Sequence, residues 1–266
     1  HFSGTKKTSL LTKSQAQLQA NLLTKFLTYR RQGLSLRTIE FYEYCLKPLV
    51  RGYPLTSNGI NSFLADLTCS NAKANYHQAI VTFVRWLLKT GYLKEDPLEE
   101  IEKPKRAKKM MPSVALEQMA FLVNEVNNLR DKAIISLLFD SGMRLTELSN
   151  IKPVDINWDS QTITIWGKGN KQRKAPFTKR SAVLLREWLC RYSPNGGSIW
   201  DINKWGIQTI LKRLGQRTGI KCNPHSFRRG FACNLHRKGL STLDIMHLGG
   251  WEHLSMVLKY TKSITF

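Results

Sequence analysis

Apolar side chains recur with helical spacing through the first hundred residues of the chain. Leu18, Leu22 and Phe26 lie on one face of a first segment, and Gly33 follows it as a stop. Three more segments repeat this spacing, so we expect a bundle of four helices. They cover residues 14–30, a stretch after Ser35, a stretch after Thr56, and about 71–89.

Capping residues and helix breakers mark the ends of these segments. Ser35 and Thr56 each precede an apolar stripe, and their side-chain oxygens can accept a hydrogen bond from a free N–H of the first turn. Pro48 is expected just beyond the second helix, because proline has no N–H and its ring clashes with the preceding turn. Gly91 is expected to end the fourth helix.

The helical pattern then stops at Pro97 and in the run 102–112, which we interpret as an extended linker. The sequence therefore predicts a helical domain over 1–101, a basic linker over 102–112 and a second domain over 113–266.

The second domain mixes helices with a short β-hairpin. Residues 161–166 alternate and are β-branched, and 173–177 return after a Gly-rich turn, with Pro176 best placed on an edge strand. The predicted fold class is mainly α with a small β-sheet: a helical bundle followed by a mixed α/β domain. Its helices are expected at 115–128, 130–141, 145–151, 179–192, 205–218, 225–238, 241–248 and 253–261.

Composition and length support two folded domains. The chain has 266 residues, of which 42% are hydrophobic, so extensive disorder is excluded. It contains neither an apolar run of membrane-spanning length nor a secretory signal. The five cysteines include no C-x-x-C pair, which favours reduced thiols in a cytoplasmic protein over disulfides or zinc.

Charge identifies the class of partner. The 41 Lys and Arg outnumber the 19 Asp and Glu, for a net charge of +22. Residues 1–101, 102–112 and 113–266 carry +6, +4 and +12, so the charge is spread rather than gathered in one amphipathic segment. This favours nucleic acid over an anionic membrane and suggests a clamp around a duplex. The linker is either a solvated connector or, as we favour, a phosphate contact.

Four motifs carry candidate chemistry. His225 and Arg228 share the first turn of a helix that begins near Pro224, where an anion site can form. The stretch G-M-R-L-T-E places Glu147 three residues after Arg144. Each of these pairs alone is a weak signal. The other two motifs are the G-K-G turn with Lys168 and L-G-G-W, whose Trp251 is followed nine residues later by Tyr260.

Taken in this order, the motifs resemble those of the tyrosine recombinases of the phage integrase family, and the resemblance covers essentially the whole chain. It implies that residues 1–101 form a core-binding DNA-binding domain and that 113–266 form the catalytic domain. It also implies a site-specific recombinase, an integrase that integrates or excises a mobile element. The enzyme is expected to act on double-stranded DNA with core-type sites, as a homotetramer on synapsed DNA and a monomer when free. A prokaryotic, DNA-associated, cytoplasmic location follows from the same resemblance.

The resemblance also implies residue roles. Tyr260 corresponds to the nucleophile, and Glu147 to an acidic residue that supports the first arginine. The remaining catalytic positions correspond to Arg144, Lys168, His225, Arg228 and Trp251. Expected DNA contacts are Lys103, Lys105, Arg106, Lys108, Lys109, Lys171, Arg173 and Arg229.

These residue types suit phosphoryl transfer without a cofactor, ATP or metal. Two arginines can hold the charge that builds on the non-bridging oxygens. His225 can assist proton transfer, Lys168 can protonate the leaving 5′ oxygen, and Trp251 can donate its indole N–H. The 3′-phosphotyrosyl bond then keeps the energy of the broken phosphodiester.

Some features depart from the family pattern. Arg229 stands where a histidine is frequent, and Trp251 stands where a second histidine is common; His253, seven residues before Tyr260, competes for that position. Only six residues follow Tyr260, and the chain begins at His1 without Met. The sequence leaves open whether an arm-type domain or an exchanged C-terminal segment lies outside it.

Two other functions stay open at this level. One is a catalytically idle DNA-binding protein on the same fold, although such a protein has no need of Tyr260. The other is DNA relaxation of the type IB topoisomerase kind, which uses the same chemistry. The sequence reveals neither the target site nor the host element, nor whether integration or excision dominates.

Overall fold

The computed structural model describes residues 11–68, 70–105, 111–167, 172–195 and 197–261. Contacts divide the chain into two compact units, His1–Lys109 and Met110–Phe266. Within the described part of the chain, no helix is long and apolar enough to cross a membrane.

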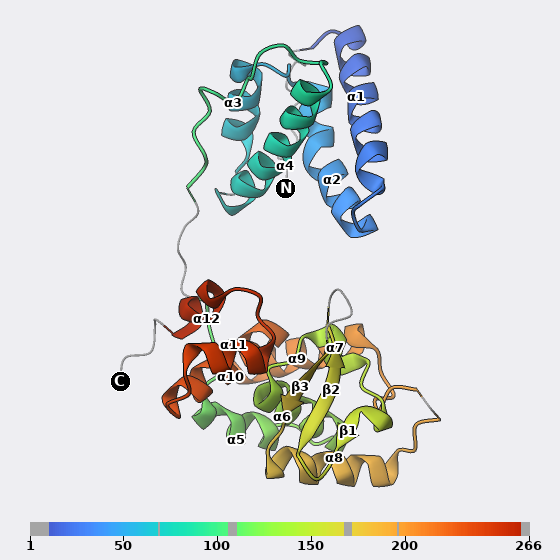
Figure 1. The fold of residues 1–266 in the computed structure, drawn as a ribbon, viewed down its shortest axis with the longest axis vertical. Coiled ribbons are helices and arrows are strands. Elements are labelled where there is room, and N and C mark those ends of the chain that lie inside the picture. The colour runs from blue at the N-terminus through green and yellow to red at the C-terminus, as the bar shows by residue number, and fades with distance from the viewer. Residues whose placement is uncertain (1–10, 69, 106–110, 168–171, 196, 262–266) are drawn as a thin grey trace. The chain divides into compact units, whose positions relative to one another are not determined.

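The described residues of the first unit form four helices around an aromatic core (Figure 1). Ser35 and Thr56 cap α2 and α3 as expected, and Phe26, Phe63 and Phe83 are fully buried. The helices are α1 (Lys13–Arg31), α2 (Leu36–Gly52), α3 (Ser57–Asp66) and α4 (Ser70–Lys89).

The expected end of the second helix at Pro48 is wrong. Pro48 lies inside α2, which continues to Gly52. The missing N–H deprives the carbonyl of Tyr44 of its partner within the helix. Tyr44 is 69% exposed, so this part of α2 faces solvent. Leu49 and Val50, just beyond the proline, are buried in the core. Their burial stabilises the last turn enough to offset the cost of the proline.

The second unit surrounds a three-stranded antiparallel sheet of order β1-β2-β3. Strands β2 (Thr162–Trp166) and β3 (Gln172–Pro176) form the expected hairpin, with Ile163 opposite Ala175 and Pro176 on the edge strand. Strand β1 (Ile156–Asn157) and the 3-10 turn η1 (Pro153–Asp155) were not predicted, because two residues are too few to show alternation.

The helices of this unit begin and end within a few residues of their expected bounds. The largest difference is in the helix expected at 115–128, because α5 already ends at Asn124. The helices are α5 (Leu116–Asn124), α6 (Leu129–Ser141), α7 (Leu145–Ser149), α8 (Lys179–Arg191), α9 (Lys204–Thr218), α10 (Pro224–Arg237), α11 (Thr242–Gly249) and α12 (Leu254–Thr261).

Two hydrophobic clusters organise the second unit. The larger one joins the sheet to α5–α9 around the fully buried Ile134 and Leu138 of α6. The smaller one joins α10, α11 and α12, which lie together in Figure 1, around Phe231, Trp251 and Val257. Three of the four motifs, those of Arg144, Arg228 and Trp251–Tyr260, therefore approach one another where these clusters meet.

Candidate active site

Arg144 is placed by a tight turn between α6 and α7. Gly142 has φ = +57°, a conformation that L-residues rarely adopt, and a Cβ on it would collide with the ring of Phe231 in α10. Met143, next in the chain, is fully buried. This turn brings Arg144 to the start of α7 with its side chain 45% exposed.

Arg228 lies one turn into α10 and is 5% exposed. Asn223 caps this helix by accepting a hydrogen bond from Ser226 N–H at 2.9 Å, and Pro224 occupies its first turn. Nη1 of Arg228 donates to the carbonyl of Gly142, which joins α10 to the α6–α7 turn. Nη2 is buried and has no hydrogen-bond partner among the described residues. A buried guanidinium with a free donor is a ready binding point for an oxyanion.

The charge around Arg228 is strongly positive. Burial lowers its pKa to about 9, and the neighbouring charges of Arg144 and Arg173 act in the same direction. Glu147 opposes this shift. Because the nearby cations outnumber this one carboxylate, a bound phosphate would relieve the repulsion between the arginines.

Glu147 is the carboxylate among Arg144, Arg173 and Arg228, and we call these four residues the cluster. The side chain of Glu147 is only 5% exposed. Oε1 accepts from Arg144 Nη1 at 2.7 Å, and Oε2 accepts from Arg144 N–H at 2.8 Å and from Arg173 Nη2 at 2.9 Å. Burial alone would raise the pKa of Glu147, but these hydrogen bonds and cations hold it below its ordinary value. The expected Arg144–Glu147 contact is thus present, and it includes a third residue.

Trp251 follows a pair of glycines at the end of α11. Gly250 adopts φ = +65°, and a Cβ on Gly249 would collide with the indole ring. Trp251 is 5% exposed and packs against Phe231, with ring centroids 6.4 Å apart. The guanidinium carbon of Arg228 lies 4.1 Å from the centroid of the indole ring. Trp251 therefore provides a cation–π contact that helps to fix this arginine.

Tyr260 is half-buried near the end of α12, and its ring centroid lies 5.9 Å from that of Trp251. The thiol of Cys233 in α10 donates to the carbonyl of Tyr260 at 3.5 Å, and Val257 anchors the same helix in the core. Tyr260 is close enough to Arg228 and Arg229 for a phenolate to raise the pKa of both, against the lowering caused by burial. The phenol therefore lies within electrostatic reach of the buried guanidinium.

His225 is exposed in the first turn of α10. Partial desolvation lowers its pKa, and the charges of Arg229, Arg228 and Arg144 lower it further. The imidazole is therefore neutral near pH 7 and can accept a proton. The competing His253 is exposed immediately before α12.

Several expected residues lie outside the described part of the chain: Lys168, Lys171, Arg106, Lys108 and Lys109. Lys103 and Lys105 are described and are exposed.

Arg173 and Arg229, two of the expected DNA contacts, are largely buried. The side chain of Arg173 is 15% exposed and is held by Glu147 and by the carbonyl of Leu248, to which Nη1 donates at 2.8 Å. Arg229 is 6% exposed, and its Nε donates to the carbonyl of Pro112 at 2.7 Å. These hydrogen bonds engage both terminal nitrogens of Arg173 and the Nε of Arg229, so both side chains are anchored within the protein.

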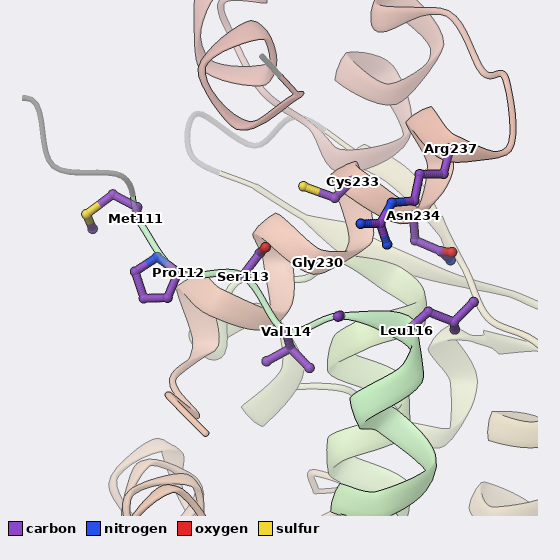
Figure 2. Close-up of a pocket in the computed structure, with 10 residues that line it drawn as sticks. Met111, Pro112, Ser113, Val114, Leu116, Gly230, Cys233, Asn234 and Arg237 are labelled. Atoms are coloured by element: carbon purple, nitrogen blue, oxygen red, sulfur yellow. The ribbon is translucent and has the colours of Figure 1, made fainter. Parts of the chain in front are cut away.

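Arg229 anchors the segment that enters the second unit. Val114 N–H donates to the carbonyl of Ser226, and Gly230 has no room for a Cβ against the Val114 carbonyl. Figure 2 shows this segment crossing α10 beside a pocket of about 320 Å³, which Cys233 also lines. The end of the linker thus lies directly against the helix that carries His225 and Arg228.

The sequence predicted neither the packing of Phe231 against Gly142 nor the pairing of Arg173 with Glu147. The Gly142 requirement depends on a ring that is 89 residues away, and Arg173 meets Glu147 across 26 residues. The only local signals were a glycine followed by Met143-Arg144 and a basic residue on the returning strand.

Comparison with known proteins defines the class. The family model described as the phage integrase family matches residues 109–265. The chain therefore belongs to this family, the tyrosine recombinases, which are DNA strand-exchange enzymes in site-specific recombination.

Similar proteins extend the match to the first unit. Tyrosine recombinase XerA of Pyrococcus horikoshii is 29% identical over 93% of this chain and 91% of its own length. Tyrosine recombinase XerC of Mannheimia succiniciproducens is 31% identical over 69% of this chain and 67% of its own length.

Solved structures share the fold. XerH recombinase bound to a palindromic difH substrate, in a post-cleavage complex, has a TM-score of 0.83 at 18% identity and covers 96% of both chains. A lambda integrase dimer bound to a COC′ core site has a TM-score of 0.77 at 15% identity, over 93% of this chain and 97% of that chain. The fold expected from the sequence, mainly helical with a small sheet, is confirmed.

Proposed function

We propose that this protein cleaves and rejoins DNA at specific sites through a 3′-phosphotyrosyl bond to Tyr260. The observation that carries the proposal is the buried Nη2 of Arg228, which has no partner among the described residues. Arg228 also contacts Trp251, which packs against the ring of Tyr260. An unpaired buried guanidinium donor beside a phenol suits a scissile phosphate next to its nucleophile.

Arg144 and Arg228 are the proposed clamp on the phosphate. Both side chains carry a planar guanidinium, so each can donate to non-bridging oxygens where negative charge develops. Arg228 is rigidly held by Gly142, whereas Arg144 is more exposed and oriented by Glu147. Their donors are therefore in place before the reaction, which lowers the reorganisation cost in the transition state.

The proposed step balances without metal or ATP. The phenolic oxygen of Tyr260 attacks phosphorus, and its proton passes to a base, for which the neutral His225 is the candidate. The bond to the 5′ oxygen breaks, and Lys168 supplies the proton for that oxygen. The reverse attack by a 5′ hydroxyl rejoins the strand, because the phosphotyrosyl bond keeps the energy of the phosphodiester.

We assign residues 1–101 as the core-binding domain, 102–112 as a linker and 113–266 as the catalytic domain. Lys103 and Lys105 are exposed in the linker and are proposed to contact DNA phosphates, together with Arg106, Lys108, Lys109 and Lys171. The proposed partner is double-stranded DNA with core-type sites, bound by four copies of the chain in a prokaryotic cytoplasm.

The biological reaction that we propose is integration or excision of a mobile element. The Xer names of the similar proteins favour a second candidate, the resolution of chromosome dimers. DNA relaxation of the type IB kind and idle DNA binding would each leave a different signature in the assays below.

Two assays test these proposals. A duplex with a nick beside the cleavage point should trap a covalent adduct, because the short leaving strand diffuses away; an idle protein would give none. A plasmid with two cognate sites should yield recombinant products. Relaxation of a plasmid without any recombinant product would indicate a topoisomerase, and a preference for paired chromosomal sites over element ends would indicate dimer resolution.

Lys168→Ala should cleave ordinary DNA slowly and recover on a substrate with sulfur in place of the bridging 5′ oxygen. A thiolate leaves with little need of a proton, so the loss of an acid matters less. The measurement is the ratio of cleavage rates on the two substrates. Lys171→Ala is the control and should show no selective recovery. If Lys171→Ala recovers instead, Lys171 is the acid.

Trp251→Ala should lose most of the activity, whereas Trp251→His should keep a substantial part because imidazole retains an N–H donor. The alanine variant also removes the support under Arg228 and Tyr260, and we expect a stability loss of about 3–5 kcal/mol. His253→Ala should be nearly silent. Cleavage rates and thermal unfolding of the three variants decide this, and a large defect confined to His253→Ala would transfer the role to His253.

A further inference from the structure

We propose that Arg173 is a positioning residue. It shares Glu147 with Arg144 and holds the turn before Trp251 in place. As a result, Arg144 and its partners keep a net positive charge, and Arg144 stays oriented toward the scissile phosphate. This inference rests on the proposed role of Arg144. Arg173 belongs to β3, whereas its two partners, Glu147 and Leu248, belong to α7 and α11.

Two hydrogen bonds define the position of Arg173. Nη2 donates to Glu147 Oε2 at 2.9 Å, and Nη1 donates to the Leu248 carbonyl at 2.8 Å. The latter carbonyl belongs to the last turn of α11, where a carbonyl has no partner within the helix. One guanidinium thus links α7, β3 and the end of α11, which only a forked donor can do.

The contact with Glu147 affects the net charge at Arg144. A buried carboxylate paired with Arg144 alone would neutralise the proposed phosphate ligand. Because Arg173 is bonded to the same carboxylate, the three groups together keep one positive charge. The second guanidinium also fixes Oε2, so that Glu147 can hold both the N–H and Nη1 of Arg144.

The contact with α11 affects the turn before Trp251. Gly250 has no side chain, and a Cβ there would lie 2.6 Å from Cδ and Nε of Arg173. The carbonyl of Gly250 in turn accepts from Arg144 Nη2 at 3.1 Å. Arg144 and Arg173 therefore donate to carbonyls of the same turn. If this turn moved, the Gly250 carbonyl that orients Arg144 would move with it.

A neutral phosphate analogue can reveal this role. A methylphosphonate at the scissile position replaces one non-bridging oxygen with a methyl group and removes the negative charge that Arg144 would stabilise. A variant that weakens the clamp should therefore lose less on methylphosphonate than on phosphodiester. A variant that is only less stable should lose equally on both.

The experiment compares strand cleavage by the full chain on nicked substrates with either linkage. Arg144→Ala should lose roughly 100–1,000-fold on phosphodiester, as for removal of an oxyanion donor. Arg173→Ala should lose roughly 10–100-fold, the range found when a group that orients a ligand is removed. Both losses should shrink at least several-fold on methylphosphonate. The cleavage rate of Arg173→Lys should lie between those of wild type and Arg173→Ala, because one ammonium cannot reach both Glu147 and the Leu248 carbonyl.

Arg130 provides a matched control. Its side chain is also 15% exposed and bridges two groups, Asp131 at 2.8 Å and Asp201 at 2.5 Å, but it lies at the start of α6 and outside the cluster. Arg130→Ala should lower thermal stability as Arg173→Ala does, with the same ratio of rates on the two linkages as wild type.

The outcomes separate the two proposals. If Arg144→Ala cleaves phosphodiester at the wild-type rate, the proposed clamp is wrong. If Arg144→Ala behaves as expected while Arg173→Ala and Arg173→Lys both keep the wild-type ratio, like Arg130→Ala, only the positioning role of Arg173 is overturned. Should Arg173→Ala not fold, the ratio measured for Arg173→Lys decides.

Discussion

Tyr260→Phe should abolish the covalent protein–DNA adduct and leave DNA binding nearly intact. Phenylalanine lacks the oxygen that is proposed to attack phosphorus, so no residual chemical step is expected. The ring still packs against Trp251, which keeps α12 in place. The measurement is the denaturant-resistant adduct on a nicked substrate, with binding followed by gel retardation.

Tyr192→Phe is the matched control for this change. Tyr192 stacks on Trp188 with ring centroids 5.0 Å apart, just after α8 and away from the cluster. This variant should form adduct at the wild-type rate. A persistent adduct in Tyr260→Phe would show that another residue is the nucleophile.

Arg228→Ala should reduce the rate of DNA cleavage more than any other substitution except Tyr260→Phe. Removal of one preorganised donor to an oxyanion costs about 3–4 kcal/mol in the transition state, or roughly 100–1,000-fold in cleavage rate. Arg228 also joins Gly142 to Trp251, so the alanine variant disturbs the site that remains. Combined with Arg144→Ala, the loss should be smaller than the sum of the two, because both arginines act on one phosphate.

Arg228→Lys distinguishes charge from geometry. Lysine keeps the positive charge but cannot donate to Gly142 and to phosphate with the same planar fork. We expect a defect close to that of alanine, with thermal stability measured alongside. Cleavage near the wild-type rate in Arg228→Lys would show that a point charge is sufficient. It would refute the proposal that the planar guanidinium must donate to Gly142 and to phosphate at the same time.

Much of the fold follows from local sequence. Helix ends at Ser35 and Thr56 were predictable because a capping side chain bonds to backbone within its own turn. The hairpin was predictable because alternation and a Gly-rich turn are local as well. Pro48 was misjudged because burial of the next turn, a tertiary effect, outweighs the local cost of proline.

The candidate site divides in the same way. The motifs of Arg144, Arg228, Trp251 and Tyr260 could be singled out from the sequence because their residue types and order resemble those of the tyrosine recombinase family. Only the tertiary structure decided that Arg228 is buried with a free donor and that Arg173 and Arg229 face protein acceptors rather than solvent. Burial and pairing depend on contacts between elements far apart in the chain, and no pattern within one element records them.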